Sequence, residues 1–133
     1  MILGFDPGRD KCGLAVIGLD QQLHYHKVVP AAEAIATIMA LCEKFPIATL
    51  VMGDQTTAKS WKQKLKSNLT GVPIVLVDER YSSLEARDRY WQMYPPKGLK
   101  RLLPQGLRQP PRPVDDIVAI LLIERYLQLG ARE

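Results

Sequence analysis

The first seventeen residues constrain the fold more than any other part of the chain. Two apolar runs, residues 2–5 and 12–17, flank a short polar segment that contains Asp-Pro-Gly, a sequence typical of turns. The pattern predicts a β-hairpin whose strands lie in the middle of a sheet. Asp6 directly follows the first run, where an unpaired buried charge is costly. Its carboxylate must therefore face solvent, a cation or a turn.

The rest of the chain alternates between strand-like and helix-like patterns. A third strand over residues 21–29 would extend the hairpin into an antiparallel meander. The other expected elements are helices over 31–44, 58–69, 82–93 and 114–129, and buried strands over 47–52 and 73–77. This order predicts an α/β fold of the ribonuclease-H-like kind, a mixed β-sheet of three antiparallel strands followed by parallel strands, flanked by helices.

The chain of 133 residues fits a single domain, 1–133, with a proline-rich basic loop over residues 94–113. No apolar stretch is long enough to span a membrane, and the start lacks the basic segment of a secretory signal. Cys12 and Cys42 stand in apolar segments, which favours buried, reduced thiols. We therefore expect a cytoplasmic protein with no membrane partner.

Candidate caps stand before two of the expected helices. Thr56 or Thr57 is placed to cap the helix over 58–69, and Ser82 or Ser83 the helix over 82–93.

Positive charge is concentrated in two segments. The net charge is +4, yet residues 55–77 hold four lysines and no acid, and residues 87–112 hold seven basic residues and one acid. Such runs are in general typical of a solvated helix face and a loop, and they also fit the phosphate backbone of a nucleic acid. Among the aromatic residues, Trp61, Tyr81 and Trp91 are candidates to stack on bases, with burial in the core as the alternative.

Acidic residues stand at the ends of the predicted elements. Asp6 ends the first strand, Asp54 follows the fourth, the pair 78–79 follows the fifth, and the pair 115–116 begins the last helix. If these strands run parallel, the acids meet at one edge of the sheet, where α/β folds bind ligands. Carboxylate oxygens select Mg²⁺ or Mn²⁺.

Two such ions can hold the attacking water and the leaving oxygen of a phosphodiester. Each acid also has a structural alternative, as a turn, loop or helix-capping residue. Of each adjacent pair, only one member is expected in the site.

His24 and His26 are two residues apart and share one face of the predicted third strand. Without a third ligand, an exposed strand face is the favoured interpretation over a metal site.

Three motifs occur in the order found in a known family. They are Gly4-Phe5-Asp6-Pro7-Gly8 with Gly13-Leu14-Ala15-Val16, then Asp78-Glu79-Arg80-Tyr81-Ser82-Ser83-Leu84-Glu85-Ala86, then Val114-Asp115-Asp116-Ile117-Val118-Ala119. They resemble the YqgF/RuvX family, Holliday-junction-resolvase-like proteins of ribonuclease-H fold related to RuvC. The resemblance implies a metal-dependent nuclease, and bacterial members are linked to maturation of the small-subunit ribosomal RNA precursor. By position, Asp6, Glu79 and Asp115 would be the catalytic carboxylates.

The chain also departs from the family pattern. Gly53-Asp54-Gln55 replaces a usual Gly-Leu-Pro, and Val118 stands where RuvC-type proteins have a further aspartate.

The sequence thus predicts an endonuclease that processes precursor small-subunit (pre-16S) ribosomal RNA by a two-metal mechanism. Asp6, Glu79 and Asp115 would bind Mg²⁺ or Mn²⁺, with Asp116 as a further candidate. The residues expected to contact nucleic acid are Arg9, Lys11, Arg80, Lys97, Lys100, Arg101 and Arg108. The partner would be RNA ahead of DNA, and the chain a monomer or weak homodimer. The alternatives are a Holliday junction resolvase acting on four-way DNA and a non-catalytic nucleic-acid-binding module.

Overall fold

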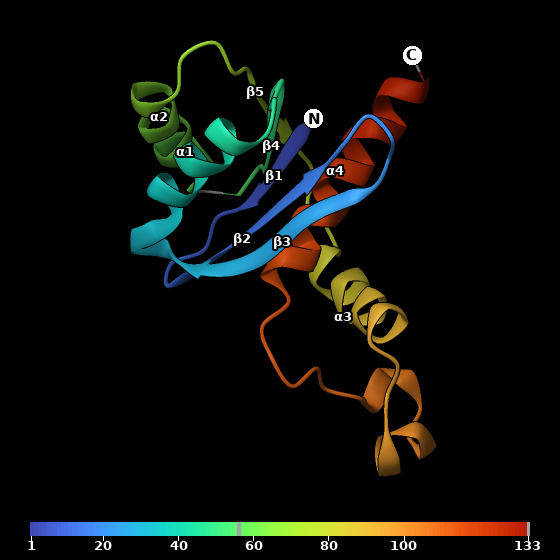
Figure 1. Ribbon diagram of the computed structural model, residues 1–133. Helices are drawn as coiled ribbons and strands as arrows, with labels where there is room; N and C mark the ends of the chain where they lie inside the picture. The colour runs from blue at the N-terminus through green and yellow to red at the C-terminus, as the bar shows by residue number, and fades with distance from the viewer. Residues whose placement is uncertain (56, 133) are drawn as a thin grey trace.

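The computed structural model describes residues 1–55 and 57–132 and contains one five-stranded sheet (Figure 1). The strands lie in the order β3-β2-β1-β4-β5. Their bounds are β1 Ile2–Asp6, β2 Lys11–Ile17, β3 Leu23–Pro30, β4 Thr49–Gly53 and β5 Ile74–Val77. β1 pairs antiparallel with β2 and β2 with β3, while β4 runs parallel to both β1 and β5. The predicted mixed sheet is confirmed, and the carboxyl ends of β1, β4 and β5 point the same way.

Helices cover both faces of the sheet (Figure 1). The short 3-10 helix η1 (Ala31–Glu33) leads into α1 (Ala34–Lys44), which packs with α2 (Ala58–Asn68) on one face. Helix α4 (Asp115–Arg132) packs on the other face, and α3 (Ser82–Met93) packs against α4. Because side chains alternate along a strand, Leu3 and Phe5 face α1 and α2, and Asp6 therefore faces α4.

Helix α4 lies very close to β1 and β2 because glycines face it. A Cβ atom at Gly4 would collide with the carbonyl oxygen of Ala119, and one at Gly13 with the carbonyl oxygen of Asp115. Gly13 pairs with Asp6 across the hairpin. The two glycines thus bring the first turn of α4 directly against the end of β1.

The helix starts differ from the predicted caps. Neither Thr57 nor Ser82 and Ser83 caps a helix with its side chain, and Thr56 lies outside the described residues. The residue before α3 is Tyr81, which adopts a left-handed backbone conformation with φ of 63°. The turn after β5 therefore depends on the backbone conformation of Tyr81 and not on a serine side chain. Both cysteines are free, as expected.

Residues 94–113, here called the arm, extend from α3 away from the sheet (Figure 1). They contain two short 3-10 helices, η2 (Gly98–Leu102) and η3 (Gln105–Leu107), where the sequence predicted a loop. Within the described residues, no helix is both long and apolar enough to cross a membrane.

Gly4→Ala should destabilise the protein because the new methyl group would push α4 off the sheet. Besides the Ala119 carbonyl oxygen, it would lie 2.8 Å from Ile123 Cγ1. We expect the free energy of unfolding, measured in urea, to fall by about 2–3 kcal/mol. Gly106→Ala is the control, since no atom lies within 4 Å of its Cβ position. Equal unfolding free energies for the two variants would contradict the close approach of α4.

Candidate active site

Asp6 is buried at the end of β1 and lies beside two other acids. Its residue is 7% exposed, although it carries a carboxyl group. The pKa of Asp6 is raised from 3.8 to about 8. Burial is the largest cause of this rise, followed by the charges of Asp115 and Glu79. The other two predicted carboxylates, Asp115 and Glu79, thus lie close enough to Asp6 for their charges to act on it.

Asp115 reaches Asp6 from the first turn of α4. The two carboxyls share a hydrogen bond in which the protonated Asp6 donates to Asp115. Burial raises the pKa of Asp115, and this hydrogen bond opposes the rise. The first turn of α4 therefore supplies one half of a carboxyl pair.

Glu79 follows β5 and enters the same region with no hydrogen-bond partner for its carboxylate. Both Oε1 and Oε2 are buried and unpaired. Burial, followed by the charge of Asp54, raises the pKa of Glu79 to about 7, while Arg125 lowers it. The carboxylate lies against Gly53, and a Cβ atom there would be 2.7 Å from Glu79 Cδ. An unpaired buried carboxylate is costly, which makes Glu79 a candidate to bind a ligand.

Arg125 of α4 holds the segment that carries Glu79. Its Nη1 and Nη2 donate to the carbonyl oxygens of Asp78 and Arg80, each at 2.8 Å. Arg125 also forms a 3.0 Å ion pair with Glu85. Asp78 is exposed and accepts the backbone N–H of Arg80, so only Glu79 of this pair faces the other acids.

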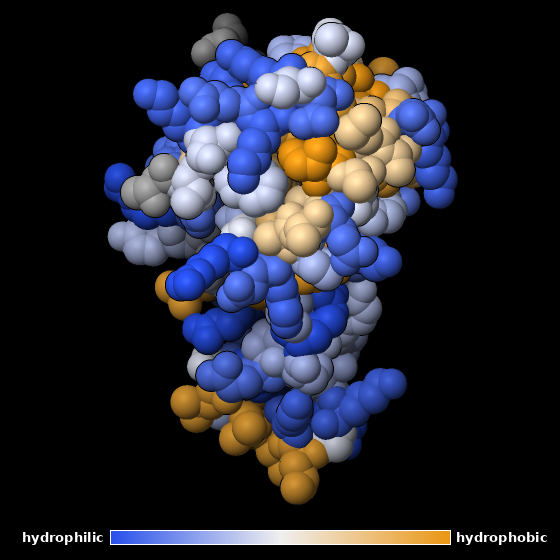
Figure 2. Space-filling view, turned by 90° about the vertical axis from the view of Figure 1, so that its left-hand side faces the viewer, coloured by the Kyte–Doolittle hydropathy of each residue, from blue (hydrophilic) through white to orange (hydrophobic). Residues whose placement is uncertain are grey.

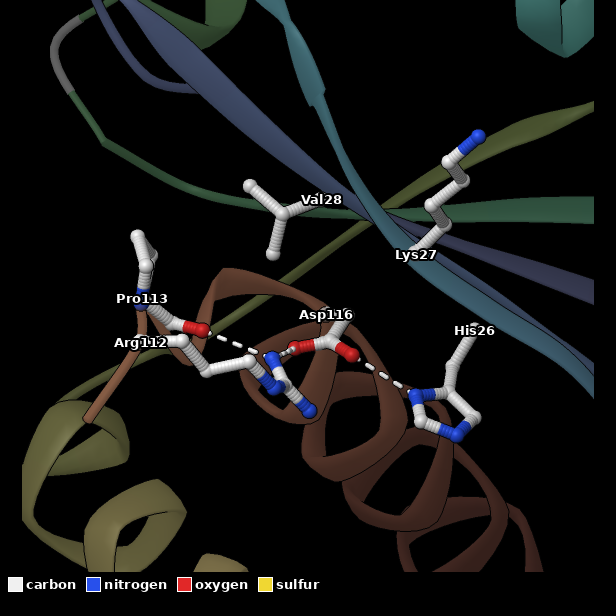
Figure 3. Close-up of a pocket in the computed structure, with 6 residues that line it drawn as sticks. All are labelled: His26, Lys27, Val28, Arg112, Pro113 and Asp116. Atoms are coloured by element: carbon white, nitrogen blue, oxygen red, sulfur yellow. Dashed lines mark hydrogen bonds and ion pairs between the residues drawn. The ribbon is translucent and has the colours of Figure 1, made fainter. Parts of the chain in front are cut away.

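Asp116 lines a hollow of about 270 Å³ between β3 and the start of α4 (Figure 3). It is 2% exposed. Its Oδ2 lies 2.6 Å from His26 Nδ1, and its Oδ1 accepts from Arg112 Nη1 and the Ile117 N–H, both at 3.0 Å. Both oxygens of Asp116 therefore have protein partners, whereas those of Glu79 have none, and metal binding by Asp116 stays a prediction.

His24 is exposed, as expected for the outer face of β3, whereas His26 is not. His26 is partly buried against Asp116, whereas His24 lies 3.2 Å from the exposed Asp20. No local pattern could indicate the contact of His26 with Asp116, because the two residues are ninety positions apart in the chain.

Of the residues predicted to contact nucleic acid, some are exposed and others are packed inside the protein. Exposed positions are occupied by Arg9, Lys11, Arg80, Lys97, Lys100 and Arg101. Arg108 is partly buried and donates to carbonyl oxygens of the arm. Trp61 packs edge-on against Phe5, and Trp91 is buried, so neither is placed to stack on bases. Tyr81 is exposed.

The donor types at this sheet edge fit a hard divalent cation. Asp6, Glu79 and Asp115 offer carboxylate oxygens, and those of Glu79 are buried without partners. Within residues 1–55 and 57–132, however, no three His, Cys, Asp or Glu side chains are close enough as arranged to hold a metal ion together.

Comparisons with known proteins agree with the fold and the motifs. The family model RuvX, described as Holliday junction resolvase, matches residues 1–129. Proteins from two strains of Coxiella burnetii, each named "Putative pre-16S rRNA nuclease", are 28% identical to this chain, and the match covers 95% of it and 91% of theirs. Thermus thermophilus RuvC has a solved structure with 15% identity and a TM-score of 0.56, covering 97% of this chain and 96% of that one. At this identity the likeness concerns the fold, and it confirms the predicted ribonuclease-H-like class.

Asp6→Asn should stabilise the metal-free protein at high pH. Because the pKa of Asp6 is raised in the folded state, the folded protein binds more protons than the unfolded one between about pH 4 and pH 8. Stability therefore falls as the pH rises through this window, and asparagine removes the Asp6 contribution. We expect urea unfolding in a chelator to show the variant more stable than wild type at about pH 8, by on the order of 2 kcal/mol. At about pH 5 this difference between the two unfolding free energies should be smaller. Parallel pH profiles for the two proteins would show that Asp6 is not under this strain.

Proposed function

Because the chain belongs to the RuvX family of Holliday junction resolvases, we propose that it is a metal-dependent endonuclease acting on structured nucleic acid. We further propose that its substrate is precursor small-subunit ribosomal RNA, the substrate class in the name of its Coxiella relatives. The observation that supports catalysis is the convergence of Asp6, Glu79 and Asp115, with a buried Glu79 carboxylate that has no protein partner.

In this proposal the three carboxylates hold Mg²⁺ or Mn²⁺ through their oxygens. When bound, two such ions would supply Lewis acidity, offsetting the charge of the phosphodiester and making water a better nucleophile. The protein keeps the acids at one place against their mutual repulsion. The raised pKa of Asp6 beside Asp115 favours a proton on Asp6 when no cation is bound, and this proton would have to leave before both carboxylates could act as ligands.

The chain also fixes the direction from which Glu79 acts. Gly53 leaves room for its carboxylate, and Arg125 holds the backbone on both sides of it. These contacts restrict where Glu79 can place its oxygens. Such restriction lowers the cost of ordering a catalytic group during the reaction.

Exposed basic residues lie near this edge of the sheet and would hold the phosphate backbone. Arg9 and Lys11 stand at the turn between β1 and β2, and Arg80 follows Glu79 directly. Phosphate contacts of this kind position a substrate without reading its sequence. In this proposal the protein acts in the cytoplasm, and its two free thiols fit a reducing compartment. Its partner would be RNA, and the protein itself would be a monomer or weak homodimer.

Two alternatives have observations in their favour. The family description favours a resolvase of four-way DNA junctions. The lack of a preformed three-ligand cluster in the described residues favours a binding module without catalysis.

A cleavage assay separates these functions. The substrates are a ribosomal RNA precursor segment and a four-way DNA junction, each with Mg²⁺, Mn²⁺ or a chelator. We expect metal-dependent RNA cleavage that falls at least about 100-fold in Asp6→Asn. The control is Asp10→Asn, which removes an exposed acid from the neighbouring turn and should keep full activity. Cleavage of the junction alone would establish the resolvase, and no metal-dependent cleavage of either substrate would leave the binding module.

Gly53→Ala should separate activity from stability. The methyl group would displace the Glu79 carboxylate, whose flexible side chain can swing toward solvent. We expect RNA cleavage to fall at least about tenfold, while the free energy of unfolding changes by less than about 1 kcal/mol because a costly buried charge is relieved. Urea unfolding and the same cleavage assay measure both. Unchanged cleavage would mean that the position of Glu79 is not critical.

A further inference from the structure

The arm ends in exposed leucines. Leu99 is 83% exposed, Leu102 80%, Leu107 67% and Leu103 43%. We call these four residues the leucine tip. In Figure 2 hydrophobic atoms gather at the foot of the molecule, where the arm ends, beside strongly hydrophilic ones. Neighbouring apolar side chains exposed in this number commonly mark an interaction site.

The leucine tip is not what holds the arm in shape. Arg108 Nε donates to the carbonyl oxygen of Lys100 at 2.9 Å, and its Nη2 to that of Arg101 at 3.3 Å. The backbone N–H groups of Leu103 and Leu107 close the two short helical turns. Six prolines between residues 94 and 113 restrict the backbone further. The leucine side chains are therefore displayed on a scaffold that other groups supply.

The root of the arm is fixed to the rest of the protein. The Arg112 guanidinium lies over the Tyr90 ring at 5.4 Å and the Tyr94 ring at 5.7 Å. The Lys100 ammonium lies 5.8 Å from the centre of the Trp91 ring. These contacts with α3 and its end hold the tip in a defined direction from the sheet.

The positive charge of the arm indicates which kind of partner it can bind. Residues 94–113 contain five basic residues and no acid, and Lys97, Lys100 and Arg101 are exposed beside the leucines. Two copies meeting at this tip would bring like charges together, which disfavours self-association. The occupant must be anionic and must also offer apolar faces. A regular duplex hides the faces of its bases, whereas a nucleic acid with unstacked bases exposes them next to its phosphates.

We propose that the arm is a second nucleic-acid-binding site, in which the leucine tip contacts unstacked bases and the basic residues hold the adjoining phosphates. This inference rests on the proposed function and narrows its substrate class to duplexes interrupted by a bulge, a junction or a single-stranded end. The site would act in substrate selection, separately from the carboxylates.

The test compares binding to a fully paired RNA duplex with binding to the same duplex carrying an unpaired bulge, in a chelator so that no cleavage occurs. We expect Leu99→Ser/Leu102→Ser to weaken binding of the bulged duplex about tenfold and to leave the paired duplex within about twofold. Leu19→Ser is the control, because Leu19 is 92% exposed in the turn between β2 and β3. It should bind both RNAs like wild type.

A charge variant separates the two halves of the site. Lys97→Ala/Arg101→Ala, which leaves the contact of Lys100 with Trp91 in place, should weaken binding of both RNAs and reduce the slope of log affinity against log salt by about 2. The leucine variant should leave that slope unchanged, since it removes no charge. An unchanged slope in the charge variant would overturn the proposed phosphate contacts.

The inference is overturned if the leucine variant binds the bulged duplex as tightly as wild type. It is also overturned if sedimentation shows that the leucine tip joins two copies and its substitution leaves both RNA affinities intact, or if an acidic protein surface proves to be its occupant. Failure of wild type to bind either RNA would count against the proposed function as well. Normal RNA cleavage by wild type, with unaltered binding by the leucine variant, would refute the arm's role alone.

Discussion

The close packing of α4 on the sheet is the contact on which the candidate site depends. Gly4 and Gly13 have no side chains to separate the helix from β1 and β2, so the first turn of α4 reaches the end of β1. One rigid element thereby performs two tasks. Asp115 in its first turn meets Asp6, and Arg125, further along, holds the backbone around Glu79. A shift of α4 would therefore disturb all three carboxylates together.

This arrangement is unfavourable to the protein without a ligand. Asp6 and Glu79 are buried among other acids, and their raised pKa values show that the folded state disfavours their charge. A fold selected only for stability would pair these groups or expose them. The core around them is apolar and well packed on both faces of the sheet, which supplies the stability that such strain requires. Strain at one edge of an otherwise consistent fold is expected where function, and not folding, determines the residues.

The fold could be predicted from the sequence because apolar runs mark the strands and helices locally. The acids at the ends of these runs indicated Asp6 and the pairs 78–79 and 115–116, and the family resemblance selected Glu79 and Asp115 from the two pairs. Contacts between distant residues left no such pattern. His26 and Asp116 meet only after the sheet forms, and the importance of Gly53 appears only once Glu79 lies against it. The expected serine caps failed for a related reason, since Tyr81 reverses the chain through its backbone and not through a side chain. Metal binding by the site stays a prediction.

Asp116 explains how the arm and the carboxylates can work on one substrate. It follows Asp115 in the chain, and its Oδ1 binds Arg112 at the root of the arm, while its Oδ2 binds His26 of the sheet (Figure 3). The arm is thus anchored one residue from the candidate active site. Phosphodiester hydrolysis by carboxylate-held cations is indifferent to base sequence, so selectivity must come from groups outside the carboxylate cluster. If the arm selects the substrate as proposed, its anchoring at the first turn of α4 would fix the distance between the place of selection and the place of cleavage.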